Sequence, residues 1–202
     1  MSDTTPQTAD GKVLWHFAMS LDGFVAGPDH AMDWMAGTSV RPGLHEEYIT
    51  TTFGRTGYQR MPRAGAGADA AVTFLGPPFA EPDPQVLRAA RSAQRALTVP
   101  NGGLGPGAAW TGTPDVAWTA ETAFFALFDA STGQHDQAAA LLDWLAAHRT
   151  SLGSLPEQVN SAGQPASTAP LSWTDAATLL ALLAQTGHIP TVPLPSVAIA
   201  SR

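Results

Sequence analysis

Apolar residues recur every three or four positions in several segments after residue 80, and this spacing predicts α-helices. The first predicted helix covers about 84–97, where Asp83 can cap the N-terminus and Pro84 occupies the first helical position. The same spacing predicts three more helices, which are expected to begin at Thr119, shortly after Gly133, and at Ser172. Thr119 and Ser172 are interpreted as N-cap residues, and the last helix is expected to end at Gly187.

Each predicted helix has its own set of recurring apolar residues. These are Val86, Leu87, Ala90, Ala93 and Leu97 in the first helix, Phe124, Phe125, Leu127 and Phe128 in the second, Ala138, Leu141, Leu142 and Leu145 in the third, and Ala176, Leu179, Leu180 and Leu183 in the fourth. Two long loops, 98–118 and 150–171, separate these helices. If neighbouring helices are antiparallel, both loops fall at the same end of the bundle and the short connection near Gly133 falls at the other.

The first part of the chain has a different pattern. Residues 12–18 form a short apolar run that is typical of a buried strand, and a first helix is expected at about 43–48. All five Met and both Tyr residues lie before residue 62, whereas the remainder is rich in Ala, Leu, Pro and Gly. We interpret this shift as two segments of different history, joined by a flexible linker at 61–68.

The expected fold class is therefore mainly α, with helical hairpins preceded by a small α/β fragment. The predicted divisions are a tail at 1–11, the α/β fragment at 12–60, the linker at 61–68, the helical part at 69–195 and a second tail at 196–202.

Composition excludes several functions. With 10 basic against 17 acidic residues and no basic run, nucleic acid is not an expected partner. The chain has no cysteine, and its six histidines show no metal-ligand spacing, so no metal site is expected. The longest apolar run, 179–184, is too short to cross a bilayer, and the N-terminus is polar. We therefore expect a cytoplasmic protein.

Part of the N-terminal segment resembles dihydrofolate-reductase-like enzymes, including the reductase domain of riboflavin biosynthesis. The resemblance lies in Ser20 to Gly27, in Asp33-Trp34, and in Gly54-Arg55-Thr56-Gly57-Tyr58. It implies an NADPH site that includes Asp22, Gly23, Gly54 and Arg55, with a glycine-led helix N-terminus at Gly54 that holds phosphate. The strands needed to complete such a sheet are missing from the sequence, so this reductase interpretation is the alternative.

The segment 69–195 resembles the C-terminal part of glucoamylase-type, six-hairpin glycoside hydrolases. The motifs are Asn101-Gly102-Gly103-Leu104, Trp118-Thr119-Ala120-Glu121-Thr122, Asp143 to His148, Leu155-Pro156-Glu157-Gln158, Gly163-Gln164-Pro165 and Pro170 to Ala176. The resemblance implies part of an α/α toroid and an α-linked glucose oligosaccharide or polysaccharide as substrate. No cofactor is implied by this resemblance.

The same resemblance implies the role of each site residue. Glu157 is the general base, since a glutamate is ordinarily ionised near neutral pH and can accept a proton from water. Gln158 is expected to bind substrate, as are Trp118 and Trp173, because sugar rings present C–H faces that stack on indole. For Trp173, a role as an apolar anchor in the core remains an equal alternative.

Inverting hydrolysis also needs a carboxylic acid, which in this family lies upstream of the resembling part. Asp115 and Glu121 do not match the acid motif, and we interpret Glu121 and Asp175 as first-turn residues that stabilise a helix dipole. The leading hypothesis is an α-glucosidic hydrolase that a partner chain completes, and the alternatives are the reductase and a non-catalytic fusion. Apolar faces with Phe124, Phe125 and Leu142 are expected to drive self-association.

Overall fold

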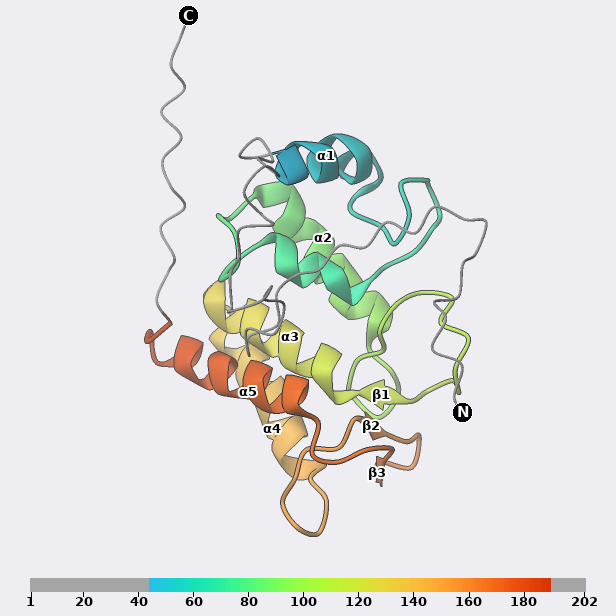
Figure 1. Ribbon diagram of the computed structural model, residues 1–202, viewed down its shortest axis with the longest axis vertical. Helices are drawn as coiled ribbons and strands as arrows, with labels where there is room; N and C mark the ends of the chain where they lie inside the picture. Colours follow the sequence, from blue (N-terminus) through green and yellow to red (C-terminus); the bar gives the residue numbers. More distant parts are fainter. Residues whose placement is uncertain (1–43, 190–202) are drawn as a thin grey trace, which may run out of the picture. The chain divides into compact units, whose positions relative to one another are not determined.

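The computed structural model describes residues 44–189. All described residues belong to one compact unit, Pro42–Arg202. The elements in chain order are α1 (Leu44–Phe53), η3 (Gly54–Thr56), η4 (Ala70–Leu75), α2 (Pro84–Leu97), β1 (Ala117–Trp118), α3 (Thr119–Ser131), α4 (His135–Ala147), β2 (Gln158–Val159), β3 (Pro165–Ala166) and α5 (Ser172–Gln185) (Figure 1). The mainly α class is confirmed. The predicted strand at 12–18, the residues Asp22 and Gly23 and both predicted tails lie wholly or mostly outside the described residues.

The predicted helices form at the expected positions, and the predicted cap of α2 is confirmed, whereas those of α3 and α5 are wrong. Asp83 caps α2, because its Oδ1 accepts hydrogen bonds from the backbone N–H groups of Gln85 at 2.6 Å and Val86 at 3.1 Å. Thr119 and Ser172 are not N-cap residues. They are the first helical residues of α3 and α5, whose N-caps, Trp118 and Leu171, make no side-chain cap hydrogen bond.

Helix α3 is the centre of the described unit and is buried on almost every side. Phe125 and Phe128 pack against α2 in one apolar cluster, which also contains Val86, Ala90, Ala93 and Leu97. Ala126 and Leu127 pack with residues of α4 and α5 in a second cluster. The apolar residues predicted for this helix are therefore only part of its buried surface, since neighbouring elements surround α3.

Helix α5 turns its small residues, not its leucines, toward the core. Its buried residues are Thr174, Ala177, Ala181 and Ala184. The recurring residues expected from the sequence do not form this buried face, since Leu179 is 59% exposed and Leu180 and Leu183 are also exposed. Alanine side chains let the α5 backbone lie close along α3, and Figure 1 shows these two helices side by side. Apolar residues occupy both faces of α5, so their spacing alone could not indicate which face is buried.

The two predicted long loops meet at the end of the bundle where α3 and α5 begin, as expected. The loop before α3 supplies β1 and the loop before α5 supplies β2 and β3, in the antiparallel order β1-β2-β3. The register pairs Trp118 with Gln158, and Gln158 with Ala166. These two-residue strands were not predicted, because each is stabilised only by its partners across the sheet.

The segment that precedes α2 packs onto the helices. Tyr58 is only 7% exposed and belongs to the same apolar cluster as Val86 and Ala90, and Ile49 and Phe53 of α1 pack against this cluster. Residues 44–60 therefore lie in the same compact unit as the helical part, although the sequence suggested a separate fragment up to residue 60. The predicted domain limits themselves stay a prediction.

One carboxyl group is buried within the helical core. Asp129 of α3 is 2% exposed, and its Oδ2 accepts a hydrogen bond from Gln94 Nε2 of α2 at 2.7 Å. Burial raises the pKa of Asp129 from 3.8 to about 6, although the hydrogen bond from Gln94 and the charge of Arg91 act in the opposite direction. The folded protein therefore holds this proton more tightly than the unfolded chain does.

Asp129 makes the free energy of unfolding depend on pH. Its stabilising contribution is present below the unfolded pKa of 3.8 and is lost as the pH rises through about 6. The effect of Asp129→Asn on the free energy of unfolding should therefore depend on pH. Relative to the wild-type chain, the variant should be more stable at about pH 7.5 than it is at pH 4, and the two effects should differ by up to roughly 3 kcal/mol. Urea denaturation at both pH values checks this, with the exposed Asp143→Asn as control. An equal effect of Asp129→Asn at both pH values would contradict the prediction.

Candidate functional site

Glu157 is held by its backbone at the end of the bundle where α3 begins. Its carbonyl oxygen accepts a hydrogen bond from the backbone N–H of Thr119 at 3.0 Å, and its own N–H donates to the carbonyl of Thr168 at 2.7 Å. The side chain is half-buried, and Ser167 Oγ donates a hydrogen bond to Oε2. Hydrogen bonds at both its N–H and its carbonyl therefore hold the backbone of Glu157, the predicted base, while its carboxylate remains accessible to solvent.

A buried pair of hydroxyl groups connects this segment to both helices. Thr119 Oγ1 of α3 donates to the carbonyl of Pro156 and lies 2.7 Å from Thr174 Oγ1 of α5. The single proton of Thr119 Oγ1 is directed at Pro156, with the carbonyl of Glu157 3.3 Å away, and in this arrangement Thr174 donates to Thr119. Both threonines are 0% exposed. The three groups fix the position of Glu157, the residue after Pro156, relative to α3 and α5.

Two of the predicted binding residues are neighbours of Glu157 in the small sheet. Gln158 is the next residue along the chain, and it pairs with Trp118 across β1 and β2. The ring of Trp118 meets the ring of Trp110 edge to face, with centroids 5.5 Å apart. Trp110 is 50% exposed and was not predicted from the sequence. Trp118 therefore adjoins the segment that contains Glu157, and Trp110 packs against Trp118.

Trp173 lies on the first turn of α5 and is 65% exposed. Its ring meets Phe124 of α3 edge to face at 6.1 Å, and Phe124 in turn meets Phe74 of η4 at 4.9 Å. Such exposure does not fit a core anchor, which was the alternative interpretation of Trp173. The row from Trp173 to Phe74 leaves aromatic surface open to solvent at the same end of the helices.

A second carboxyl group, Glu121, lies in a small cleft beside these aromatic residues. The cleft has a volume of about 230 Å³, and its lining includes Glu121, Asp69, Phe74, Trp110 and Phe124. One carboxyl oxygen of Glu121, Oε2, is buried and has no hydrogen-bond partner. Burial raises the pKa of Glu121, a hydrogen bond from its own backbone amide opposes this rise, and the charges of Asp69 and Glu157 add to it.

Glu121 was interpreted from the sequence only as a first-turn residue that stabilises the dipole of α3. That role alone would favour the ionised form and lower its pKa, whereas the structure raises it. The pKa of Glu121 is raised because residues of η4 and of the loop before β1, which are distant from Glu121 in the sequence, bury its carboxyl group. The sequence signal available was the position of Glu121 within the motif Trp118 to Thr122, which carries no information on burial.

The Asn101-Gly102-Gly103-Leu104 motif supports the site without contributing a reactive group. Asn101 Nδ2 donates to the carbonyl of Asn160 at 3.0 Å, and Trp144 Nε1 donates to the carbonyl of Asn101 at 2.8 Å. A Cβ at Gly103 would lie 2.5 Å from side-chain atoms of Ala117 and Trp144, so only glycine fits there. The motif thus anchors the loop before β1 to α4 and to the segment after β2.

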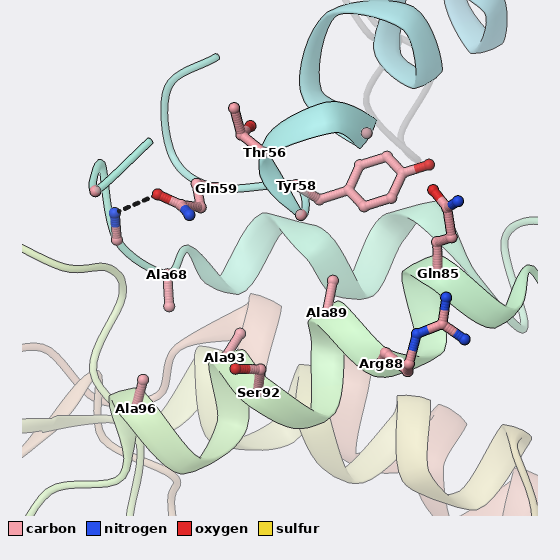
Figure 2. A pocket seen from close by; sticks show the side chains of 14 residues that line it. Thr56, Tyr58, Gln59, Ala68, Gln85, Arg88, Ala89, Ser92, Ala93 and Ala96 are labelled. Carbon is pink, nitrogen blue, oxygen red and sulfur yellow. Dashed lines mark hydrogen bonds between the residues drawn. The ribbon is translucent and has the colours of Figure 1, made fainter. Parts of the chain in front are cut away.

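The alternative cofactor residues Gly54 and Arg55 lie apart from these groups. Gly54 adjoins a larger cleft of about 630 Å³ between α2 and the segment 54–68, which Figure 2 shows with Arg88, Gln85 and Tyr58 around it. The expected helix N-terminus at Gly54 is not formed, because η3 follows α1 directly and its N-cap residue, Phe53, is itself in the helical conformation. Arg55 does not line this cleft.

Within the described residues, no group of three or more His, Asp and Glu side chains could hold a metal ion. In the same part of the chain, no helix has both the length and the apolar character needed to cross a membrane.

Comparison with known proteins gives a fold and no family. No family model matches the chain, and no curated protein matches it. Two solved structures do match, a wild-type glycosidase and a single-residue variant of a glycosidase, each with a TM-score of 0.56 and 20% identity. Each match covers 74% of this chain and 46% of the glycosidase, so the chain spans less than half the length of these neighbours. At this identity the similarity concerns the fold alone, which is glycosidase-like over the matched residues.

The hydroxyl pair predicts a stability effect that reaches Glu157. Thr119→Val removes the donor to Pro156 and the acceptor for Thr174, so two buried polar groups lose a partner. We expect the free energy of unfolding to fall by about 1–3 kcal/mol, and hydrogen exchange at the Glu157 amide to accelerate. Thr186→Val is the control, because its exposed hydroxyl bonds only to nearby groups at the C-terminal end of α5, which are the carbonyls of Leu182 and Leu183 and the Nδ1 atom of His188. Equal losses in both variants would contradict a special role for Thr119.

Proposed function

We propose that this chain carries the base side of a glycoside hydrolase that cleaves α-glucosidic bonds with inversion, with Glu157 as general base. The observation that carries this proposal is the position of Glu157, whose accessible carboxylate lies at the loop end of a glycosidase-like fold. The order of the elements also supports it, since α3 and α5 begin at the same end and α4 returns between them. Successive hairpins of an α/α toroid have this order.

Glu157 has the surroundings that a general base requires. The hydroxyl of Ser167 donates to Oε2 and orients the carboxylate, which leaves Oε1 to accept a proton from water. Its backbone hydrogen bonds to Thr119 and Thr168 limit movement of the residue. A base that is already positioned activates water without further ordering of the chain.

The aromatic residues around the site suit a sugar substrate. Trp173 and Trp110 are half or more exposed, and Trp118 lies between Trp110 and Gln158. Indole rings offer flat apolar surface to the C–H faces of glucose, and Gln158 offers an amide that can both donate and accept hydrogen bonds. We propose that these residues bind an α-linked glucose oligosaccharide, and that a partner chain completes the wall of the site.

The partner proposal includes self-association, through a different surface from the one expected. Phe125 is 0% exposed, and Phe124 and Leu142 are partly buried, so the face predicted from the sequence is covered. The uncovered apolar surface lies on α5, whose exposed leucines are Leu179, Leu180, Leu182 and Leu183. Burying such a row between two copies would remove apolar surface from water, which favours association.

Replacement of the proposed base gives the direct test of hydrolysis. Glu157→Gln keeps the size of the side chain but cannot accept a proton from water, so glucose release from maltose or starch should fall about 10²–10⁴-fold. Exposed Glu81→Gln is the matched control and should retain wild-type activity. Glucose release that is unaffected by Glu157→Gln would refute the role of this residue.

Size-exclusion chromatography combined with light scattering tests the α5 surface. A variant with Leu179→Glu and Leu182→Glu changes two leucines that are 59% and 51% exposed, so it should fold normally and shift the protein toward monomer. Exposed Glu81→Gln should leave the assembly unchanged. A wild-type protein that is monomeric at high concentration would contradict self-association.

A further inference from the structure

We propose that the cleft between α2 and the segment 54–68 is a binding site for a small organic anion, whose acidic group lies against Arg88. The cleft has a volume of about 630 Å³. Sites for small molecules are typically about 300–1,000 Å³ in volume, so the cleft is large enough for such a ligand. The proposal does not depend on the hydrolase function, since the residues that line this cleft are not those around Glu157.

Three polar side chains gather at one end of the cleft. Figure 2 shows the hydroxyl of Tyr58 pointing toward Gln85, with Arg88 beside Gln85 on α2. The numbering places Gln85 and Arg88 at positions i and i+3 of the helix, which lie on the same face. A Cβ at Gly54 would lie 3.5 Å from Tyr58 Oη and 3.9 Å from Gln85 Oε1. The hydroxyl and the amide therefore border one small space, which glycine leaves open.

These three side chains lack a partner in the part of the chain that the structure describes. Tyr58 is only 7% exposed, yet its hydroxyl makes no hydrogen bond to a described residue. The amide of Gln85 and the guanidinium of Arg88 also make no hydrogen bond or ion pair there. Polar groups of residues as buried as Tyr58 ordinarily have a partner in the protein. The three groups are therefore available to a ligand in the cleft.

The charge of the lining favours an anion. Among the described residues that line the cleft, Arg88 is the only charged one, although the whole chain carries 17 acidic residues and only 10 basic ones. A guanidinium binds a carboxylate or a phosphate through two parallel N–H···O bonds, and no carboxylate among these lining residues competes for it. The Tyr58 hydroxyl and the Gln85 amide offer further donors to the same acidic group.

The rest of the cleft suits a flat, uncharged body attached to the acidic group. Small side chains of α2 form one wall, and glycine residues of the segment 54–68 form part of the other. The residues are Ala89, Ala93 and Ala96 on α2, and Gly57, Gly65 and Gly67 opposite them. Alanine side chains leave room for a ring, and glycine lets a ligand approach the backbone closely. We therefore expect an aromatic carboxylate or an aryl phosphate to fit this cleft.

A nuclear magnetic resonance titration of the full, ¹⁵N-labelled chain tests the site with benzoate, phenyl phosphate and benzamide. Benzamide has the shape of benzoate but no charge. We expect either anion to shift the amide signals of Gly57, Gly65 and Gly67, with a millimolar Kd because the probes are small. Benzamide should bind at least about tenfold more weakly than benzoate, because it cannot form a charged pair with Arg88.

Three variants change the site in different ways. Arg88→Gln should weaken benzoate binding about 10–100-fold, whereas Arg95→Gln, on the exposed surface of α2 outside the cleft, should leave it unchanged. Tyr58→Phe removes a hydroxyl without a protein partner, so it should weaken binding about 2–10-fold without lowering the melting temperature. Gly54→Ala adds a methyl group at ordinary contact distance, so it should fold normally and weaken binding by obstructing the space beside Tyr58.

Saturable shifts at the three glycines that are lost in Arg88→Gln support the proposal. It is overturned if neither anion shifts these signals, if benzamide binds as tightly as benzoate, or if Arg88→Gln and Arg95→Gln bind benzoate equally well. Circular dichroism shows whether each variant folds. If Arg88→Gln does not fold, Tyr58→Phe and Gly54→Ala decide, and unchanged benzoate binding in both overturns the proposal.

Discussion

The buried contact between Thr119, Thr174 and the carbonyl of Pro156 is the interaction on which the rest of the site depends. It joins the first turns of α3 and α5 to the segment that carries Glu157, and all three groups are shielded from water. In this environment an unpaired hydroxyl or carbonyl is costly, so the three groups stabilise one arrangement over its alternatives. The position of Glu157 and the pairing of Gln158 with Trp118 follow from that arrangement.

This contact is possible because α5 presents small residues to α3. Ala177, Ala181 and Ala184 continue the buried face that Thr174 begins, so the two helix backbones lie close over their whole length. The leucines of α5 are consequently displaced to the outer surface, where they remain exposed. The packing of the small residues of α5 against α3 therefore explains both the contact between the Thr119 and Thr174 hydroxyls and the exposed leucines on the outer surface of α5.

Three carboxyl groups of this chain illustrate how surroundings, and not residue type, set chemistry. Asp129 is buried in the core with one donor, Gln94, and its raised pKa is a cost to the folded state. Glu121 lines a cleft, one of its carboxyl oxygens is buried without a hydrogen-bond partner, and burial raises its pKa. Glu157 is half-buried and accepts a hydrogen bond from the hydroxyl of Ser167.

The sequence by itself determined the mainly α class, the position of α2 with its Asp83 cap, the starts of α3 and α5 and the shared end of the two long loops. These features depend on the spacing of apolar residues and on the conformational preferences of proline and glycine. Both signals come from residues that are close together in the sequence. Only the tertiary structure decided which face of α5 is buried, that Thr119 bonds to Pro156 instead of capping its helix, and that residues of η4 and of the loop before β1 surround Glu121. Each of these depends on residues distant in the chain, whose approach and exclusion of water no local pattern records.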